Sequence, residues 1–330
     1  MKHGGDLTEA MARYGGSLQM WLDLSTGVNP WPWPIPGDLP GALWLRLPSR
    51  ADEENLIAAA REAYAIPTGA EVVAASGTQS LIQWLPQLAS DGPVAIVEPT
   101  YNEHAAAWRM GGHEVIACAD FDELPQAVRY AVVVNPNNPD GRVMSRAVLA
   151  RVAEQLRERG GWLVVDEAFA DIEPEISVAG LCADLSVVVL RSFGKFYGLA
   201  GLRLGFAIAS PDIARRIAQA LGPWPCSGPA LSIGAAALGD RVWADRTRVA
   251  IQAHARKLDD VLAGAGFTIA GGTGLFRLAR HADASKVHTT LATKHIWCRS
   301  FDWADDLLRF GLPPGDRDLE RLAAALGSCR

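Results

Sequence analysis

Lys195 is the residue of this 330-residue chain best suited to form a covalent bond with an aldehyde. It is one of only five lysines, and its neighbours are aromatic or small: Phe193, Gly194, Phe196 and Tyr197. A lysine in such apolar surroundings loses hydration, and desolvation favours the neutral amine, which is the nucleophile that forms a Schiff base. The run around Lys195 therefore indicates carbonyl chemistry.

A carboxylate and an anion-binding turn accompany this lysine. Asp166 ends the apolar segment 162–165, where a buried charge needs a cationic partner. Ser76, Gly77 and Thr78 follow a second apolar segment and open a predicted helix. Backbone N–H groups in a small turn at a helix start bind anions such as phosphate. Ser and Thr are also ordinary helix caps, so this turn alone does not decide the chemistry.

Aromatic and amide side chains follow two further apolar segments. Tyr101 and His104 come after residues 94–97, and Asn138 comes after residues 131–134 in a turn rich in Asn and Pro. Ligands of an open α/β sheet bind beyond the carboxyl ends of its strands, so we expect these motifs to share one site. A lysine for an aldehyde, an aspartate for a pyridinium nitrogen, a phosphate-binding turn and an aromatic plate together describe a site for pyridoxal 5'-phosphate (PLP).

The segments that position these residues have the composition of buried strands that alternate with helices. Nearly continuous Val, Ile and Leu runs are typical of a sheet covered on both faces. The intervening segments 79–88, 103–110 and 145–159 carry apolar residues at helical spacing. We therefore predict an α/β fold whose large domain is a three-layer α/β/α sandwich with a mostly parallel seven-stranded sheet. Its predicted strands are residues 72–75, 94–97, 114–117, 131–134, 162–165, 186–190 and 204–208.

The two ends of the chain differ from this central pattern. Residues 1–45 are dense in Pro and Trp, which predicts an extended arm that joins the small domain. Residues 46–228 form the predicted large PLP-binding domain. Residues 229–330 form a predicted small C-terminal α+β domain. It is helical to Gly264 and continues with strands at 267–269, 275–278 and 295–298 and a helix at 317–326.

Composition and charge exclude several classes of function. The net charge is −6 and no segment is rich in Lys and Arg, so we expect neither a nucleic-acid nor a membrane partner. Apolar stretches fall far short of the roughly 20 residues that span a bilayer, and the N-terminus lacks the apolar core of a signal peptide, which predicts a cytoplasmic location. The five cysteines are scattered, and His281, His288 and His295 have no clustered co-ligands, so we predict no disulfide framework and no metal.

The joint order of the motifs resembles the fold-type I PLP-dependent aminotransferases of class I and II. The resemblance implies that Lys195 holds the cofactor covalently and that Asp166 pairs with its pyridine nitrogen. It further implies that Tyr101 stacks on the ring, that Asn138 donates to the ring hydroxyl and that His104 is a partner of the aspartate. The residues that carry this resemblance are 76–78, 99–101, 135–139, 166–169, 192–195 and Arg203.

The resemblance also implies a binding site for the cofactor phosphate and a quaternary structure. The cofactor phosphate would be held by Gly77, Thr78, Ser192 and Arg203, with Ser76 beside them, and the family pattern implies a homodimer with its sites at the subunit interface. Two positions depart from the pattern. Phe169 stands where many transaminases have Tyr, and Leu47 stands where related enzymes have a Tyr that reaches the neighbouring subunit's cofactor phosphate.

Within this family, the N-terminal segments 3–6 and 23–30, together with Asp-Glu-Ala-Phe at 166–169, resemble the threonine-phosphate decarboxylases of cobalamin biosynthesis. This implies a lyase that decarboxylates L-threonine O-3-phosphate to (R)-1-amino-2-propanol O-2-phosphate. Candidate substrate-binding residues are Asn29, Asn138, Arg299 and Arg309.

Three alternatives stay open at this stage. A histidinol-phosphate-type aminotransferase is the nearest one, because residue types alone do not separate decarboxylation from transamination. A degenerate aminotransferase-like binding module is the non-enzymatic one, although Lys195 and Asp166 are retained. The two C-terminal arginines could also form ordinary surface salt bridges, since the chain has many arginines.

Overall fold

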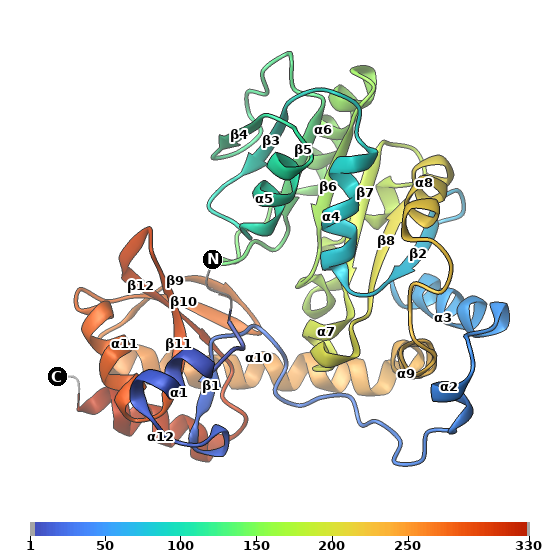
Figure 1. Cartoon of the computed structure of the whole chain (residues 1–330). Coiled ribbons are helices and arrows are strands. Elements are labelled where there is room, and N and C mark those ends of the chain that lie inside the picture. Colours follow the sequence, from blue (N-terminus) through green and yellow to red (C-terminus); the bar gives the residue numbers. More distant parts are fainter. Residues whose placement is uncertain (1–3, 329–330) are drawn as a thin grey trace. The chain divides into compact units, whose positions relative to one another are not determined.

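The structure is a computed structural model that describes residues 4–328, and its contacts divide the chain into two compact units (Figure 1). Unit 1 comprises Met1–Trp31, Pro139–Gly141 and Asp245–Arg330, and unit 2 comprises Pro32–Asn138 and Arg142–Ala244. Both ends of the chain therefore belong to the same unit. The domain limits expected after residues 45 and 228 stay a prediction.

Unit 2 is built on a seven-stranded sheet of order β2-β8-β7-β6-β5-β3-β4. Only β8 runs antiparallel to its neighbours, and the other pairs are parallel. Each strand overlaps one of the seven predicted segments, so the predicted α/β fold with a mostly parallel sheet is confirmed. The strands are β2 (Glu71–Ala75), β3 (Val94–Val97), β4 (Val115–Cys118), β5 (Tyr130–Val134), β6 (Trp162–Asp166), β7 (Val187–Ser192) and β8 (Gly205–Ala209).

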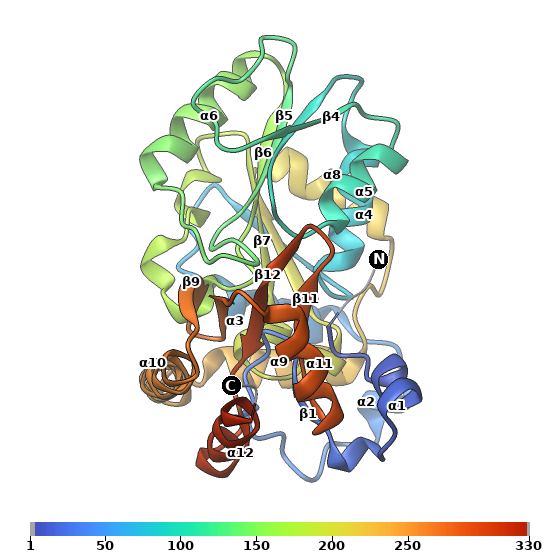
Figure 2. The same ribbon diagram turned by 90° about the vertical axis from the view of Figure 1, so that its left-hand side faces the viewer.

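Helices cover both faces of this sheet, as Figure 2 shows nearly edge-on. One face carries α4 (Thr78–Leu88), α5 (Glu103–Met110) and α8 (Pro211–Leu221), and the other carries α6 (Arg146–Glu158). Because both faces are covered, β5 and β6 are buried along their whole length. Burying a Val or Leu side chain stabilises the fold by about 1.5–3 kcal/mol. Unit 2 also contains α2 (Ala42–Leu45), α3 (Arg50–Ala63), α7 (Phe193–Phe196) and α9 (Gly228–Gly239).

Unit 1 is built on a five-stranded sheet of order β1-β11-β12-β10-β9. Strand β1 (Leu22–Leu24) comes from the N-terminal segment and pairs in parallel with β11, whereas the other pairs are antiparallel. The predicted C-terminal strands and final helix are confirmed. The remaining elements are α1 (Thr8–Tyr14), β9 (Thr268–Thr273), β10 (Phe276–Arg280), α11 (Ala284–Thr293), β11 (Ile296–Phe301), β12 (Ala304–Gly311) and α12 (Asp316–Gly327). Helix α10 (Arg241–Gly264) begins in unit 2 and belongs to unit 1 from Asp245 onward.

The N-terminal segment corrects one expectation. An extended arm is expected over the first 45 residues, but α1 and β1 interrupt it. Leu7, Ala10 and Trp21 form a small buried cluster, so apolar burial stabilises regular structure there. The Pro-rich stretch 32–36 has neither helix nor strand, as its prolines require.

None of the helices in residues 4–328 is long and apolar enough to cross a membrane. The cytoplasmic location stays a prediction.

Candidate active site

Asp166 is a buried carboxylate at the carboxyl end of β6. It is 3% exposed, and its Oδ2 lies 2.9 Å from Nε2 of His104, a buried residue of α5. The backbone N–H of Ala168 donates to its Oδ1 at 3.1 Å. The contact expected between His104 and Asp166 is thus present, and it orients a carboxylate that can pair with a protonated ring nitrogen.

The predicted anion-binding turn lies between β2 and α4. Gly77 has a φ of +78°, and a Cβ there would lie 2.8 Å from Nη2 of Arg203, so the guanidinium packs directly against the turn. Thr78 opens α4, whose first N–H groups have no partner within the helix. Ser192 at the end of β7 pairs with Gly205, and a Cβ on Gly205 would lie 2.6 Å from the Thr78 nitrogen. Helix-start N–H groups and a cation therefore lie together, and the backbone of Ser192 is adjacent through Gly205, as a phosphate site requires.

Ser76 contributes to this turn in a different way. Its hydroxyl donates to the carbonyl oxygen of Pro225 at 2.6 Å, and its side chain is exposed. The hydroxyl therefore ties the turn to the segment before α9.

Lys195 lies in α7, directly after β7, and its side chain is half-buried. Its Nζ lies 5.9 Å from the ring centroid of Phe169, which follows β6. The aromatic residues beside it in sequence are buried, but they pack elsewhere: Phe193 stacks on Tyr197 at 4.5 Å, and Tyr197 stacks on Trp243 at 5.6 Å. These stacks fix the short helix that presents the lysine.

Tyr101 is held by Gln79, a residue outside the predicted site. Its hydroxyl donates to Oε1 of Gln79 at 3.2 Å, and Nε2 of Gln79 donates to Glu103 at 3.0 Å. Burial, and then the carboxylates of Glu103 and Asp166, raise the pKa of Tyr101 to about 12. The ring is therefore neutral, and it meets the imidazole of His104 edge-on at 6.2 Å. The position of Gln79 in the first turn of α4 is the sequence signal for this role.

Asn138 is half-buried, and the residue before it, Asn137, joins two loops. Asn137 accepts a hydrogen bond from the Thr100 hydroxyl at 2.6 Å and donates to the Pro99 carbonyl at 2.9 Å. The loop that carries Asn138 is thus tied to the loop that carries Tyr101.

These residues fit PLP. A buried acid, a phosphate-type anion site, an aromatic ring and a lysine all lie at the carboxyl ends of the strands of unit 2, as a ring nitrogen, a phosphate and an aldehyde require. Among residues 4–328, no group of His, Cys, Asp and Glu could hold a metal ion.

The three further substrate candidates belong to unit 1. Arg309 of β12 is 7% exposed, donates to the Ser25 carbonyl at 2.6 Å and is the register partner of Arg299 on β11. Burial, and then the cation of Arg299, lower the pKa of Arg309 to about 10. Burial also lowers the pKa of Arg299. Asn29 is buried and accepts a hydrogen bond from the Trp31 N–H at 3.0 Å. Arg309 is therefore not a surface salt-bridge residue.

The two departures from the family pattern lie in different environments. Phe169 is buried beside Lys195, whereas Leu47 is 64% exposed.

Comparison with known proteins identifies the family of the chain. Residues 50–326 match the family model described as aminotransferase class I and II. The chain belongs to this family. Aminotransferases of class I and II are PLP-dependent enzymes, so this chain is a PLP-dependent enzyme and not a degenerate binding module.

Two curated relatives of this aminotransferase-family chain match it over almost its full length. The threonine-phosphate decarboxylase of Sinorhizobium sp is 45% identical and covers 98% of this chain and 97% of its own. The threonine-phosphate decarboxylase of Pseudomonas aeruginosa is 41% identical and covers 99% of this chain and 97% of its own.

Two solved structures share the aminotransferase fold of the chain. The histidinol-phosphate aminotransferase from Clostridium acetobutylicum has a TM-score of 0.81 at 20% identity, and covers 93% of this chain and 98% of its own. The L-threonine-O-3-phosphate decarboxylase from Porphyromonas gingivalis has a TM-score of 0.75 at 20% identity, with the same two coverages.

Proposed function

We propose that the chain is a PLP-dependent lyase that decarboxylates L-threonine O-3-phosphate to (R)-1-amino-2-propanol O-2-phosphate in cobalamin biosynthesis. The observation that carries this proposal is the similarity to two threonine-phosphate decarboxylases, at 45% and 41% identity over nearly the whole chain. The fold alone does not favour a substrate, because histidinol-phosphate aminotransferases share it.

In this proposal unit 2 holds the cofactor. PLP supplies an electron sink for the bonds of the substrate α-carbon. Lys195 attaches it covalently, and Asp166, oriented by His104, keeps its ring nitrogen protonated. Tyr101 stacks on the ring, Asn138 donates to its hydroxyl, and the phosphate is bound at the α4 turn by Gly77, Thr78, Ser192 and Arg203, with Ser76 supporting the turn.

Unit 1 supplies the groups for the anionic ends of the substrate. Arg309 binds the carboxylate and Arg299 binds the phosphate, with Asn29, and Asn138 of unit 2, as polar partners. Burial and the charge of Arg299 disfavour the charged form of Arg309 more than Asp23 favours it, so a bound anion would stabilise that charge, which supports this assignment.

We also propose a homodimer with its sites at the subunit interface. Trp44, Leu45 and Leu47, on and just after α2, are strongly exposed apolar side chains, which a second copy would cover. A fully active monomer in sedimentation experiments would overturn this part.

Product analysis tests the reaction. Purified protein loaded with PLP should release CO2 from L-threonine O-3-phosphate without an added keto acid. Activity only on histidinol phosphate with a keto acid acceptor would replace decarboxylation by transamination.

Borohydride reduction and peptide mapping test the lysine. The label should lie on Lys195, and Lys195→Ala should abolish both labelling and CO2 release. Lys257→Ala is the matched control, because Lys257 is an exposed lysine paired with Asp316 at 2.7 Å and should leave both unchanged. A label on another lysine would overturn the assignment.

A further inference from the structure

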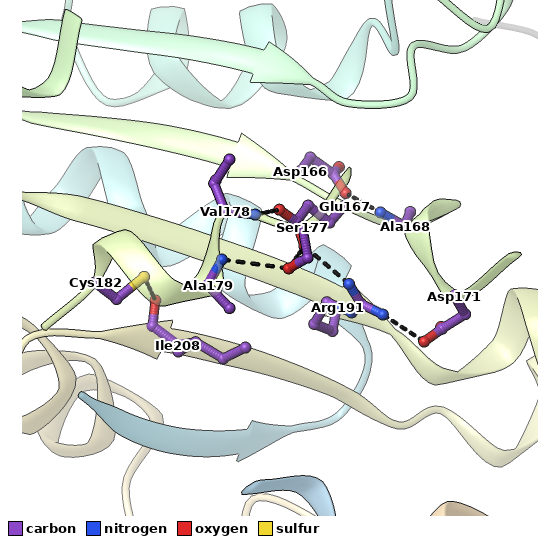
Figure 3. Close-up of polar contacts among 10 residues, drawn as sticks. All are labelled: Asp166, Glu167, Ala168, Asp171, Ser177, Val178, Ala179, Cys182, Arg191 and Ile208. Atoms are coloured by element: carbon purple, nitrogen blue, oxygen red, sulfur yellow. Dashed lines mark hydrogen bonds and ion pairs between the residues drawn. The ribbon is translucent and has the colours of Figure 1, made fainter. Parts of the chain in front are cut away.

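A buried ionic cluster lies at the carboxyl ends of β6 and β7 (Figure 3). Arg191 donates through Nη1 to Oε2 of Glu167 at 2.8 Å and through Nη2 to Oδ1 of Asp171. The Ser177 hydroxyl and the Val178 N–H each donate to Glu167 at 2.6 Å. Arg191, Glu167 and Asp171 are at most 3% exposed. We call these three charged residues, with Ser177, the Arg191 cluster.

The cluster is adjacent in sequence to two proposed cofactor residues but lies on the opposite face of the sheet. Glu167 directly follows Asp166, and Arg191 directly precedes Ser192. Successive strand residues point to opposite faces, so Arg191 does not share the face of Ser192. Asp166 contacts His104 of α5, whereas Glu167 contacts the segment at Ser177. The cluster is therefore joined to Asp166 and Ser192 through the backbone of the two strand ends.

The backbone ladder between β6 and β7 stops where the cluster begins. The last register pair is Asp166 with Leu190, and the Glu167 N–H donates to the Leu190 carbonyl at 2.9 Å. Beyond that point, Arg191 and Ser192 have no register partner on β6 and keep the pairing with β8 that Val189 and Leu190 also make. The ion pair between Arg191 and Glu167 thus continues the link between the two strand ends after their hydrogen bonds end.

Fold stability is a poor reason for such a cluster. Burial raises the pKa of Glu167 even though Arg191 is in contact with it, which reflects the cost of removing these charges from water. Well-packed apolar side chains in place of a buried ion pair often give equal or greater stability. Arg191 binds the carboxylates of Glu167 and Asp171 at the same time through its planar guanidinium. Such bonds fix the relative positions of the segments that carry these residues.

We propose that the Arg191 cluster is a positioning device that holds Asp166 and Ser192 at the separation and orientation that PLP requires. This inference rests on the proposed roles of Asp166 at the ring nitrogen and Ser192 at the phosphate. PLP is a rigid ring with both groups attached, so a shift of one strand end relative to the other misplaces one of the two contacts. Arg191 and Glu167 are positioning residues and do not touch the cofactor.

The test compares PLP binding by Arg191→Lys and Glu167→Gln with a matched control. Arg191→Lys keeps the charge but cannot bridge two carboxylates, and Glu167→Gln keeps the shape but removes the ion pair. Leu149→Ala, at a fully buried residue of α6, destabilises the fold without touching either strand end. Each apo protein is titrated with PLP at a temperature where circular dichroism shows every variant folded.

We expect the PLP dissociation constant to rise about tenfold or more in both cluster variants, as is typical when a group that orients a direct ligand contact is lost. The pH dependence of the bound cofactor's absorbance should shift as well, because Asp166 controls the protonation of the ring nitrogen. Leu149→Ala should lower Tm and change neither.

Two different failures are distinguishable in this experiment. If both cluster variants bind PLP with the wild-type constant and the wild-type pH profile, and only Tm falls, the cluster is structural and the positioning inference is wrong. If the wild-type protein itself does not bind PLP through Lys195, the proposed function fails, and this inference fails with it.

Discussion

Arg191 in unit 2 and Arg309 in unit 1 are both buried arginines, but their charged neighbours differ. Burial disfavours the charge of Arg191, but Asp171 and Glu167 outweigh it and hold the pKa of Arg191 above its ordinary value. Around Arg309, burial and the neighbouring Arg299 act in the same direction and lower its pKa to about 10. Two carboxylates, Asp171 and Glu167, balance the charge of Arg191, whereas the carboxylate of Asp23 favours the charged form of Arg309 less than burial and Arg299 disfavour it.

The difference separates an internal role from a binding role. An arginine between two carboxylates fixes the distance between segments of its own chain, and its removal leaves buried charges behind. The repulsion between two neighbouring arginines makes folding less favourable, and an anionic substrate that binds between them would relieve this repulsion. The positioning role proposed for Arg191 and the substrate role proposed for Arg309 follow this division.

The largest effect should come from Asp166, a buried carboxylate next to the Arg191 cluster but not paired with its arginine. Asp166→Asn should leave PLP bound and lower kcat about 10³-fold or more, because a neutral amide does not hold the ring nitrogen protonated. Absorbance measures cofactor loading and CO2 release measures kcat. Near-normal turnover would contradict the assigned role.

The free energy of unfolding gives the most direct test of the comparison. Arg191→Met leaves two buried carboxylates without their cation and should destabilise the protein by about 3–5 kcal/mol. Arg309→Met removes a cation that lies beside another one and should cost much less. Urea denaturation followed by circular dichroism measures both. Equal losses would show that the two arginines serve the fold in the same way.

A smaller effect is expected on substrate recognition. Arg309→Lys keeps the charge but loses the planar fork, and should lower kcat/KM for L-threonine O-3-phosphate about 100-fold, the loss expected when a hydrogen-bonded charge pair is broken. Arg280→Lys is the matched control, because Arg280 lies on the same sheet, is exposed and pairs with Asp306. Equal activity of the two variants would remove Arg309 from the substrate site.

The smallest effect should lie at the start of α3, away from both arginines. Ser49 and Asp52 form a capping box, and hydrogen bonds from the Arg46 side chain and from Ser49 lower the pKa of Asp52 to about 2. Ser49→Ala should cost about 1 kcal/mol of stability without changing activity. The contribution of Asp52 is present above the unfolded pKa of 3.8 and is lost as the pH falls through the folded pKa of about 2, so the stability difference between Asp52→Asn and wild type should shrink over this range. A difference that stays constant from about pH 5 down to about pH 2 would contradict this.

The sheet of unit 2 was predictable because its strands are short and apolar on both faces. A run of β-branched and apolar residues such as Val187–Leu190 is too short for a buried helix and is typical of a buried strand. The helix α3 has no counterpart among the predicted ranges, although Ser49 followed by Asp52 is a start signal for it. Its apolar face is narrow, so periodicity alone is a weak indicator. Helix α1 was missed because its burial depends on Trp21, which follows the helix, and on Trp297, which is distant in sequence.

The site was predictable as an order of motifs but not as a set of contacts. Sequence neighbours suggested an aromatic environment for Lys195, yet the ring close to its amine is that of Phe169. Arg191 and Glu167 stand inside the predicted motifs, but their pairing depends on which strands are adjacent in the sheet. Likewise, only the register of β11 and β12 shows that Arg299 and Arg309 lie opposite each other.

The parallel pairing of β1 with β11 has a consequence for biosynthesis. Leu22 pairs with Ile296, so the sheet of unit 1 waits for the last part of the chain, whereas every strand of unit 2 lies between residues 71 and 209. At about 5–20 residues per second, translation of the intervening segment takes on the order of tens of seconds. During that interval Leu22 and Leu24, which are buried in the finished protein, lack the strand that pairs with them. All strands of unit 2 are therefore synthesised before the partner of β1, although β1 itself is made first.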